Sequence, residues 1–249
     1  APGIGQRGAI LIDSRRLIVR LYSNAVVVVH MVDSTHGVTK CIEGVVPFVS
    51  LNEPVYDGSK FLYVFQRGGC HFGRIDLDAW AFEELSSFPE DISFYSEAEG
   101  CWHMGNVYMV GSDYQLYQYN VSTNKWSCGL GRIGLGETCD KYGFNSSRYT
   151  PYRQNARLLS NPHDENNIYI VVMQAYNRGR NGKWDNDIRV FDTATKTSRP
   201  LRSLEFLGEK ISGRDTAVIE WLENGFSAVT KTKNKNFCVF STSRVFFKL

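Results

Sequence analysis

The chain has 249 residues, of which 43% are hydrophobic, 22% are charged and 13% are aromatic, and its formal net charge is +2. This balance is typical of a folded globular protein and excludes a disordered one. Its basic residues are scattered rather than gathered into a stripe, so we expect no nucleic-acid partner. Its longest apolar run (25–29) is far shorter than the roughly 20 residues that span a bilayer, so we expect no membrane span.

Short apolar and aromatic runs bounded by turn residues follow one another along the whole chain, and they predict β-strands. In chain order these runs are 17–21, 25–32, 61–66, 107–111, 115–119, 168–173, 188–191, 217–222 and 237–240. Turn signals such as Asp57-Gly58 and Asn224-Gly225 lie between them. Apolar residues at helical spacing are rare, so we expect an all-β fold.

An internal repeat organises these strands. Residues 72–82 (FGRIDLDAWAF) align without gaps on 116–126 (LYQYNVSTNKW), and 188–198 (IRVFDTATKTS) follows the same pattern. In each copy a strand ends in a hydrophobic residue, which is followed by a small polar residue, a short turn and another strand. This polar column comprises Asp33, Asp76, Asn120, Asp192 and Ser241. Such side chains bond backbone groups two residues on and start a turn, and the residue after the turn can pack back across the hairpin.

The spacing of the polar column indicates the architecture. Successive members lie 43 (33 to 76), 44 (76 to 120), 72 (120 to 192) and 49 (192 to 241) residues apart, and three of these match the roughly 40–50 residues of a propeller blade. The sequence therefore predicts a single five-bladed β-propeller of four-stranded antiparallel blades over residues 1–249. The expected blades are 8–46, 52–90, 97–131, 149–204 and 216–249. A β-sandwich with regular hairpins is the alternative.

One copy of the repeat resembles the kelch type of β-propeller. The segment NVYMVGSDYQLYQYNVSTNKWSCG looks like the core of a kelch repeat, with Gly111, Tyr119, Asn120 and Trp126 at matching positions. Of the double glycine typical of kelch repeats, Gly111 alone remains. Five blades and an extracellular setting also resemble olfactomedin-type propellers in architecture, although no motif of that family is found. Both resemblances imply a propeller.

Cysteines and glycosylation sequons point to the secretory pathway. The six cysteines lack zinc-site spacing, and their even number suits disulfides, with about 15 connectivities open. The pairing we expect first is Cys128 with Cys139, which would close a glycine-rich loop. Asn120 and Asn145 each begin an Asn-x-Ser sequon and are expected to carry glycans. We therefore expect a secreted, extracellular glycoprotein with no metal site of recognisable spacing.

The residues expected to bind a ligand lie in two segments that lengthen the fourth repeat. They combine aromatic rings with arginines and carboxylates, the usual anchors of an interface, and they could also stack on a sugar. These residues are Tyr149, Tyr152, Tyr176, Arg178, Arg180, Trp184, Asp185 and Asp187. Oxygen atoms of 185–187 are a candidate Ca²⁺ set, although not with EF-hand spacing, and no other cofactor is expected. A long solvated hairpin is the alternative interpretation of 174–187.

The function that these features favour is a secreted binding module that recognises a protein or a cell-surface glycan through loops on one face. The sequence contains neither a G-x-S-x-G nucleophile elbow nor an H-E-x-x-H motif, so catalytic residues are not identified. The alternatives are an extracellular hydrolase with its active site at the mouth of the propeller channel, and a structural domain that acts as an oligomer. The sequence does not determine the oligomeric state.

Overall fold

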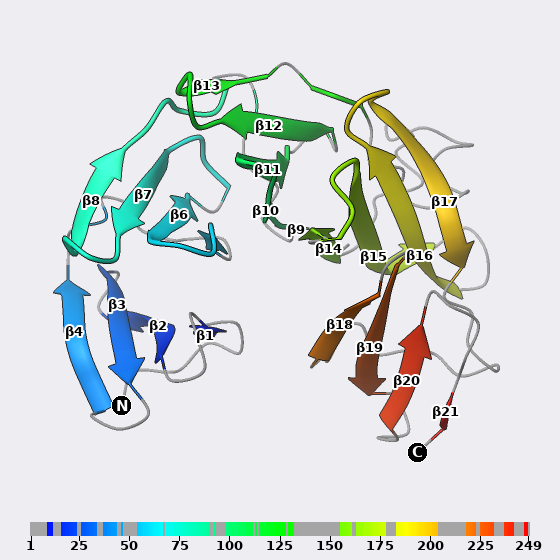
Figure 1. The fold of residues 1–249 in the computed structure, drawn as a ribbon, viewed down its shortest axis with the longest axis horizontal. Helices are drawn as coiled ribbons and strands as arrows, with labels where there is room; N and C mark the ends of the chain where they lie inside the picture. Colours follow the sequence, from blue (N-terminus) through cyan, green and yellow to red (C-terminus); the bar gives the residue numbers. More distant parts are fainter. Residues whose placement is uncertain are drawn as a thin grey trace. The chain divides into compact units, whose positions relative to one another are not determined.

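The computed structural model describes the chain in part, and Figure 1 shows its ribbon. The residues described are 9–11, 16–23, 26–33, 37–43, 46, 54–66, 68–89, 92, 98–111, 113, 115–127, 129–131, 155–160, 163–177, 183–203, 218–222, 225–231, 237–241 and 247–248. They form strands and turns and contain no helix, hence no helix that could cross a membrane. The chain divides into two compact units, one of 1–113 with 117–128 and one of 114–116 with 129–249.

The first unit is built on three antiparallel sheets whose strands follow chain order (Figure 1). The first sheet comprises β1 (Ala9–Leu11), β2 (Arg16–Ser23), β3 (Val26–Asp33) and β4 (Gly37–Glu43). The second comprises β5 (Val55–Tyr56), β6 (Phe61–Phe65), β7 (Phe72–Asp76) and β8 (Ala81–Glu84). The short strand β9 (Ala98–Glu99) precedes the third sheet, which comprises β10 (Cys101–His103), β11 (Asn106–Val110), β12 (Leu116–Asn120) and β13 (Lys125–Trp126).

The second unit contains two further antiparallel sheets. In one, strands lie in the order β17-β16-β15-β14; they are β14 (Asn155–Ser160), β15 (Asn167–Asn177), β16 (Lys183–Asp192) and β17 (Thr197–Ser203). The other comprises β18 (Val218–Leu222), β19 (Gly225–Lys231), β20 (Phe237–Ser241) and β21 (Phe247–Lys248), again in chain order. Each sheet is thus an antiparallel meander, and in the three sheets whose third connection is described, that connection is a turn.

The structure confirms the polar column, because each member is the last residue of the third strand of its sheet. These residues are Asp33 in β3, Asp76 in β7, Asn120 in β12, Asp192 in β16 and Ser241 in β20. Oδ1 of Asp76 accepts the N–H groups of Asp78 (2.9 Å) and Ala79 (3.0 Å). Oδ1 of Asp192 accepts those of Ala194 (2.9 Å) and Thr195 (2.8 Å). The side chains therefore start the turns, as the sequence predicted.

A second rule of these turns was not visible in the sequence. The fourth residue after the polar one has a left-handed backbone in each described copy: Trp80 (φ 55°), Asn124 (φ 53°) and Lys196 (φ 57°). Non-glycine residues rarely adopt this conformation. Here it reverses the chain directly before the fourth strand, which begins at the next residue in all three sheets.

The described core lies between the second and third sheets of the first unit and is mainly aromatic. Phe72 in β7 is fully buried, and its ring centroid lies 4.7 Å from that of Tyr119 and 5.0 Å from that of Trp126. Phe88 also contacts Trp126, at 4.9 Å. Trp126 is directly opposite Tyr119 in the strand register, so the residue after the turn packs back across its hairpin as predicted.

A polar clip joins the same two sheets at the β12–β13 turn. Oδ1 of Asn124 accepts the N–H of Ser86 (3.1 Å) and the hydroxyl of Tyr119 (2.6 Å). The Ser86 hydroxyl donates to the Asn124 carbonyl (2.7 Å), and the indole N–H of Trp126 donates to the Ser86 carbonyl (2.9 Å). Ser86 follows β8, so these bonds connect the edge of one sheet to the turn of the next.

Candidate binding ribbon

The two longest strands of the described chain, β15 with 11 residues and β16 with 10, extend beyond their sheet. Strand β14 accompanies β15 from Ile168 to Met173, and strand β17 accompanies β16 from Asp187 to Asp192. Beyond these flanking strands, residues 175–177 pair with 183–185 and with no other described strand, and 174 and 186 lie at the bulge between the two parts. We call this two-stranded projection the ribbon.

The strand register brings several of the expected ligand-binding residues together in the ribbon. Tyr176 lies opposite Trp184, and Asp185 lies opposite Ala175. Asp187 is at the base of the ribbon, opposite Val172 on one side and Ser203 on the other. The register shifts between Val172 and Ala175, so a β-bulge marks the place where the ribbon leaves the sheet; bulges bend a strand and redirect it.

Sequence reasoning treated 174–187 as an inserted loop, and the structure shows continued strands on both sides of its tip. The predicted strands ended at residue 173 and resumed at 188 because the polar residues between them carry no apolar alternation. Residues 175–177 pair with 183–185 as a hairpin, and both interpretations of this segment are compatible with that pairing. Arg178 and Arg180 at the tip, and Tyr149 and Tyr152 in the preceding segment, lie outside the described residues.

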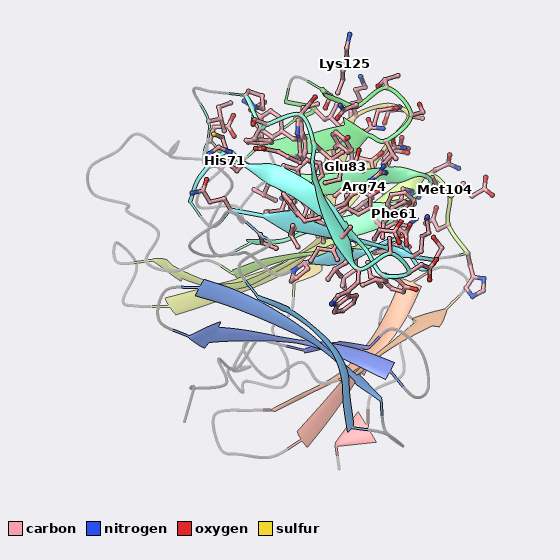
Figure 2. The ribbon with its side chains drawn as sticks, turned by 90° about the vertical axis from the view of Figure 1, so that its left-hand side faces the viewer. Phe61, His71, Arg74, Glu83, Met104 and Lys125 are labelled. Carbon is pink, nitrogen blue, oxygen red and sulfur yellow. The ribbon has the colours of Figure 1, made fainter. Side chains whose placement is uncertain are left out.

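Charged side chains of the second sheet cluster around Phe61 at the start of β6, and we call this group the Phe61 rim (Figure 2). Arg74 lies over the Phe61 ring at 4.1 Å from its centroid and pairs with Glu83 across the strands at 2.7 Å. Lys60 also lies over this ring, at 4.6 Å, and pairs with Asp76 at 3.0 Å. Each cation in the rim thus has a carboxylate and an aromatic face, an arrangement suited to stabilising the hairpin surface.

Backbone bonding holds the rim carboxylate Asp76 in its ionised form. The N–H of Ala79 lowers the pKa of Asp76 below its ordinary value, and Lys60 adds to this effect. Beneath the rim, burial raises the pKa of Tyr63. The Tyr63 hydroxyl is buried near Arg74, in an orientation that forms no hydrogen bond of standard geometry with the described residues. The rim is therefore a set of internal pairs on top of the aromatic core.

Candidate catalytic side chains in the described part are buried or paired on the surface. His103 is 2% exposed and its ring packs against Tyr108. Burial raises the pKa of the Cys101 thiol, and it raises that of Tyr108 to about 12. Exposed His71 lies 3.4 Å from Glu84. The described ranges hold no group of three or more His, Cys, Asp or Glu side chains that could bind a metal ion.

Of the expected modifications, the structure describes one site. Asn120 lies at the end of β12, whereas Asn145, Cys128 and Cys139 fall outside the described residues, so the disulfide stays a prediction. Among the described cysteines, Cys70 and Cys101 are free thiols.

Comparison with family models and with curated proteins finds no match to this sequence. Solved structures do match. They include TolB from Acinetobacter baumannii (13% identity, TM-score 0.53, 94% of this chain and 51% of that one) and Kuenenia stuttgartiensis hydrazine synthase (13%, 0.56, 99% and 66%). A nidogen/laminin complex also matches (11%, 0.51, 92% and 75%). The antiparallel meander sheets and the similarity to these structures together indicate the architecture of the chain.

The fold is a β-propeller. At these identities the likeness establishes the propeller architecture and does not single out the kelch or the olfactomedin type. The chain spans about half the length of the TolB chain that it matches. In a propeller, central strands are covered by neighbouring blades on both faces, and this explains why β6 and β11 are nearly continuous apolar runs rather than alternating ones.

Proposed function

We propose that the chain is a secreted, protein-binding β-propeller that engages its partner through the ribbon. The observation that carries the proposal is the part of the β15–β16 hairpin, residues 175–177 and 183–185, that among the described strands pairs only with itself. On this proposal the five sheets are five blades of one domain, and the repeat around Gly111 is of the kelch type.

The backbone of the ribbon supports this role. A two-stranded hairpin without further strands is marginally stable by itself, and its outer edges present unpaired N–H and C=O groups. Such edges accept an additional strand from a partner, while aromatic and arginine residues supply the anchors that dominate binding energy. Tyr176 and Trp184 occupy facing positions in the ribbon, and Arg178 and Arg180 lie between its two strands in the sequence.

Two further observations favour binding of a protein over catalysis. The described carboxylates Asp76 and Asp192 hold turns, and Glu83 is paired with Arg74, so these groups belong to the scaffold. One structural neighbour is a propeller-containing complex of two proteins, nidogen and laminin. The even cysteine count and the two sequons support secretion.

Flow cytometry on cells of the source organism tests the proposal. The fluorescently labelled full chain is compared with Tyr176→Ser/Trp184→Ser and with the control Met104→Ser, which removes an exposed hydrophobic residue in the first unit (57% exposed). Three results together support the proposal. Binding is saturable and survives Met104→Ser. It falls about tenfold or more in the ribbon variant, as loss of two aromatic anchors implies, and it disappears after protease treatment of the cells.

Three results would contradict the proposal. Equal binding by the ribbon variant would remove the ribbon from the interface. Binding that is lost after glycosidase treatment but resists protease would replace the protein partner with a glycan. Absence of any saturable binding, combined with turnover of hydrolase substrates by the same preparation, would favour the enzyme alternative.

A further inference from the structure

Asn120 has a place in the repeat that is filled by aspartate in the neighbouring described copies. Asp76, Asn120 and Asp192 all end a third strand, and in all three one side-chain oxygen, Oδ1, holds the turn. Oδ1 of Asn120 accepts the N–H of Thr123 (3.0 Å) and the hydroxyls of Ser122 (2.7 Å) and Thr123 (3.1 Å). The turn therefore depends on one of the two terminal atoms of the side chain.

The other terminal atom of Asn120, the amide nitrogen Nδ2, takes no part in these bonds. Two other asparagines at strand starts differ in this respect. Nδ2 of Asn106 donates to the Met104 carbonyl (2.9 Å), and Nδ2 of Asn167 donates to both oxygens of Asp164 (3.0 Å each). A group attached to Nδ2 would compete with those bonds at Asn106 and Asn167, whereas at Asn120 it would leave the turn intact.

The space beside Asn120 is also different from that beside its counterpart. Lys60 precedes the second strand of its sheet and its ammonium occupies Oδ2 of Asp76 (3.0 Å). The residue in the same place before β11 is Gly105. A Cβ built at Gly105 meets no atom of the described residues within 4 Å, and Gly105 has no side chain that could reach Asn120 as Lys60 reaches Asp76. The turn residues 122–125 that follow Asn120 are exposed.

We propose that Asn120 carries an N-linked glycan that the folded propeller accommodates on this turn. Asn120-Val121-Ser122 is a sequon, and Ser122 supplies the required hydroxyl. In the transfer, Nδ2 forms a bond to the anomeric carbon of a lipid-diphosphate-linked oligosaccharide in the endoplasmic reticulum. The bond from that carbon to the diphosphate oxygen breaks, the lipid diphosphate leaves with the bonding electrons, and Nδ2 loses one proton to a base of the transferase. In the folded glycoprotein Oδ1 is left to make its three bonds.

Peptide mass spectrometry tests this site separately from the other sequon. The full chain is directed into the endoplasmic reticulum of cultured cells by an added signal sequence, and total lumenal protein is collected so that secretion is not required. Trypsin places Asn120 in the peptide 75–125 and Asn145 in the peptide 142–148, because no lysine or arginine lies within 75–124 or 142–147. Enzymatic deglycosylation in ¹⁸O-water then marks each formerly glycosylated asparagine as labelled aspartate.

Melting of three forms tests the structural part of the proposal. Asn120→Asp removes the acceptor nitrogen but keeps Oδ1, so at neutral pH its Tm is expected within about 2 °C of the unglycosylated wild type. Asn120→Ala removes Oδ1 and is expected to lower Tm by more than about 2 °C. The Tm of the glycosylated wild type should be close to that of Asn120→Asp and higher than that of Asn120→Ala.

Labelled aspartate at position 120, with the melting order just given, would support the proposal. A peptide 75–125 that stays unlabelled in lumenal protein, whatever the state of Asn145, would overturn it. A labelled peptide from protein that melts as low as Asn120→Ala would overturn the claim that the fold accommodates the glycan. Neither result depends on the ribbon, so the site can fail while the proposed function holds.

Discussion

The left-handed residue of the β12–β13 turn, Asn124, allows side-chain bonding to be separated from backbone conformation. Glycine is the residue best suited to a φ of 53°, so Asn124→Gly relieves backbone strain while it removes the side chain. Lys196 has the equivalent place in the β16–β17 turn, with a φ of 57° and an exposed side chain. Lys196→Gly is therefore a matched control that changes the backbone preference alone.

The magnitudes follow from the bonds that each variant loses. Asn124→Gly removes Oδ1, which accepts two hydrogen bonds, one from the Ser86 N–H and one from the Tyr119 hydroxyl, worth about 1–3 kcal/mol together. Tyr119 is 1% exposed, so its hydroxyl would lose its partner inside the core. Relief of the left-handed conformation returns about 0.5–1 kcal/mol. The net loss is about 1.5 kcal/mol, or roughly 3–6 °C in Tm for a chain of this size.

Thermal unfolding followed by near-ultraviolet circular dichroism measures both variants, because Tyr119 and Trp126 lie beside the altered turn. We expect Asn124→Gly to melt roughly 3–6 °C below wild type and Lys196→Gly to melt at or slightly above it. If both variants gain stability by the same amount, the clip between Ser86 and Asn124 contributes nothing and the reasoning is refuted. If both lose the same amount, glycine entropy dominates at this position instead.

Three further predictions concern the core, a glycine and acid stability. Phe72→Ala should lower the free energy of unfolding by about 3–5 kcal/mol, because the ring is fully buried between two sheets. Urea unfolding should show a lower midpoint with an unchanged slope. A decrease under about 1 kcal/mol would mean that the core closes over the gap. Gly73→Ala should lower Tm, since its Cβ would overlap the Phe82 ring and lie 2.7 Å from the Glu83 carbonyl oxygen; an unchanged Tm would contradict this close packing. Asp192→Asn should make Tm fall less steeply as the pH is lowered. The Thr195 N–H lowers the folded pKa of Asp192 below 3.8, so the stability that ionised Asp192 contributes is present above that value and is lost as pH falls through the folded pKa. An acid-melting profile identical to wild type would exclude this contribution to stability.

The sequence was sufficient to predict the elements that depend on local chemistry. The polar column was found because Asp and Asn favour turns, and each predicted member ends the third strand of its sheet. The left-handed residues were missed because Trp80 and Lys196 have no intrinsic preference for that conformation, which the hairpin geometry imposes. The ribbon was missed because no apolar alternation marks its residues, and its strands are recognised only by their pairing with each other.

The turn column also shows how a repeat can keep one structural role and acquire several chemical ones. Holding the turn takes Oδ1 alone, so the second terminal atom is free to differ between copies. In Asp76 that atom binds Lys60 and joins the Phe61 rim; in Asn120 it is an amide nitrogen that takes no part in the bonds holding the turn. Because aspartate and asparagine are nearly isosteric, either residue can hold the turn through Oδ1 while its second terminal atom differs. The same reasoning implies that Asp76→Asn would leave its turn formed and weaken only the contact to Lys60. Because the Lys60–Asp76 pair is partly exposed, the free energy of unfolding should fall by less than about 1 kcal/mol.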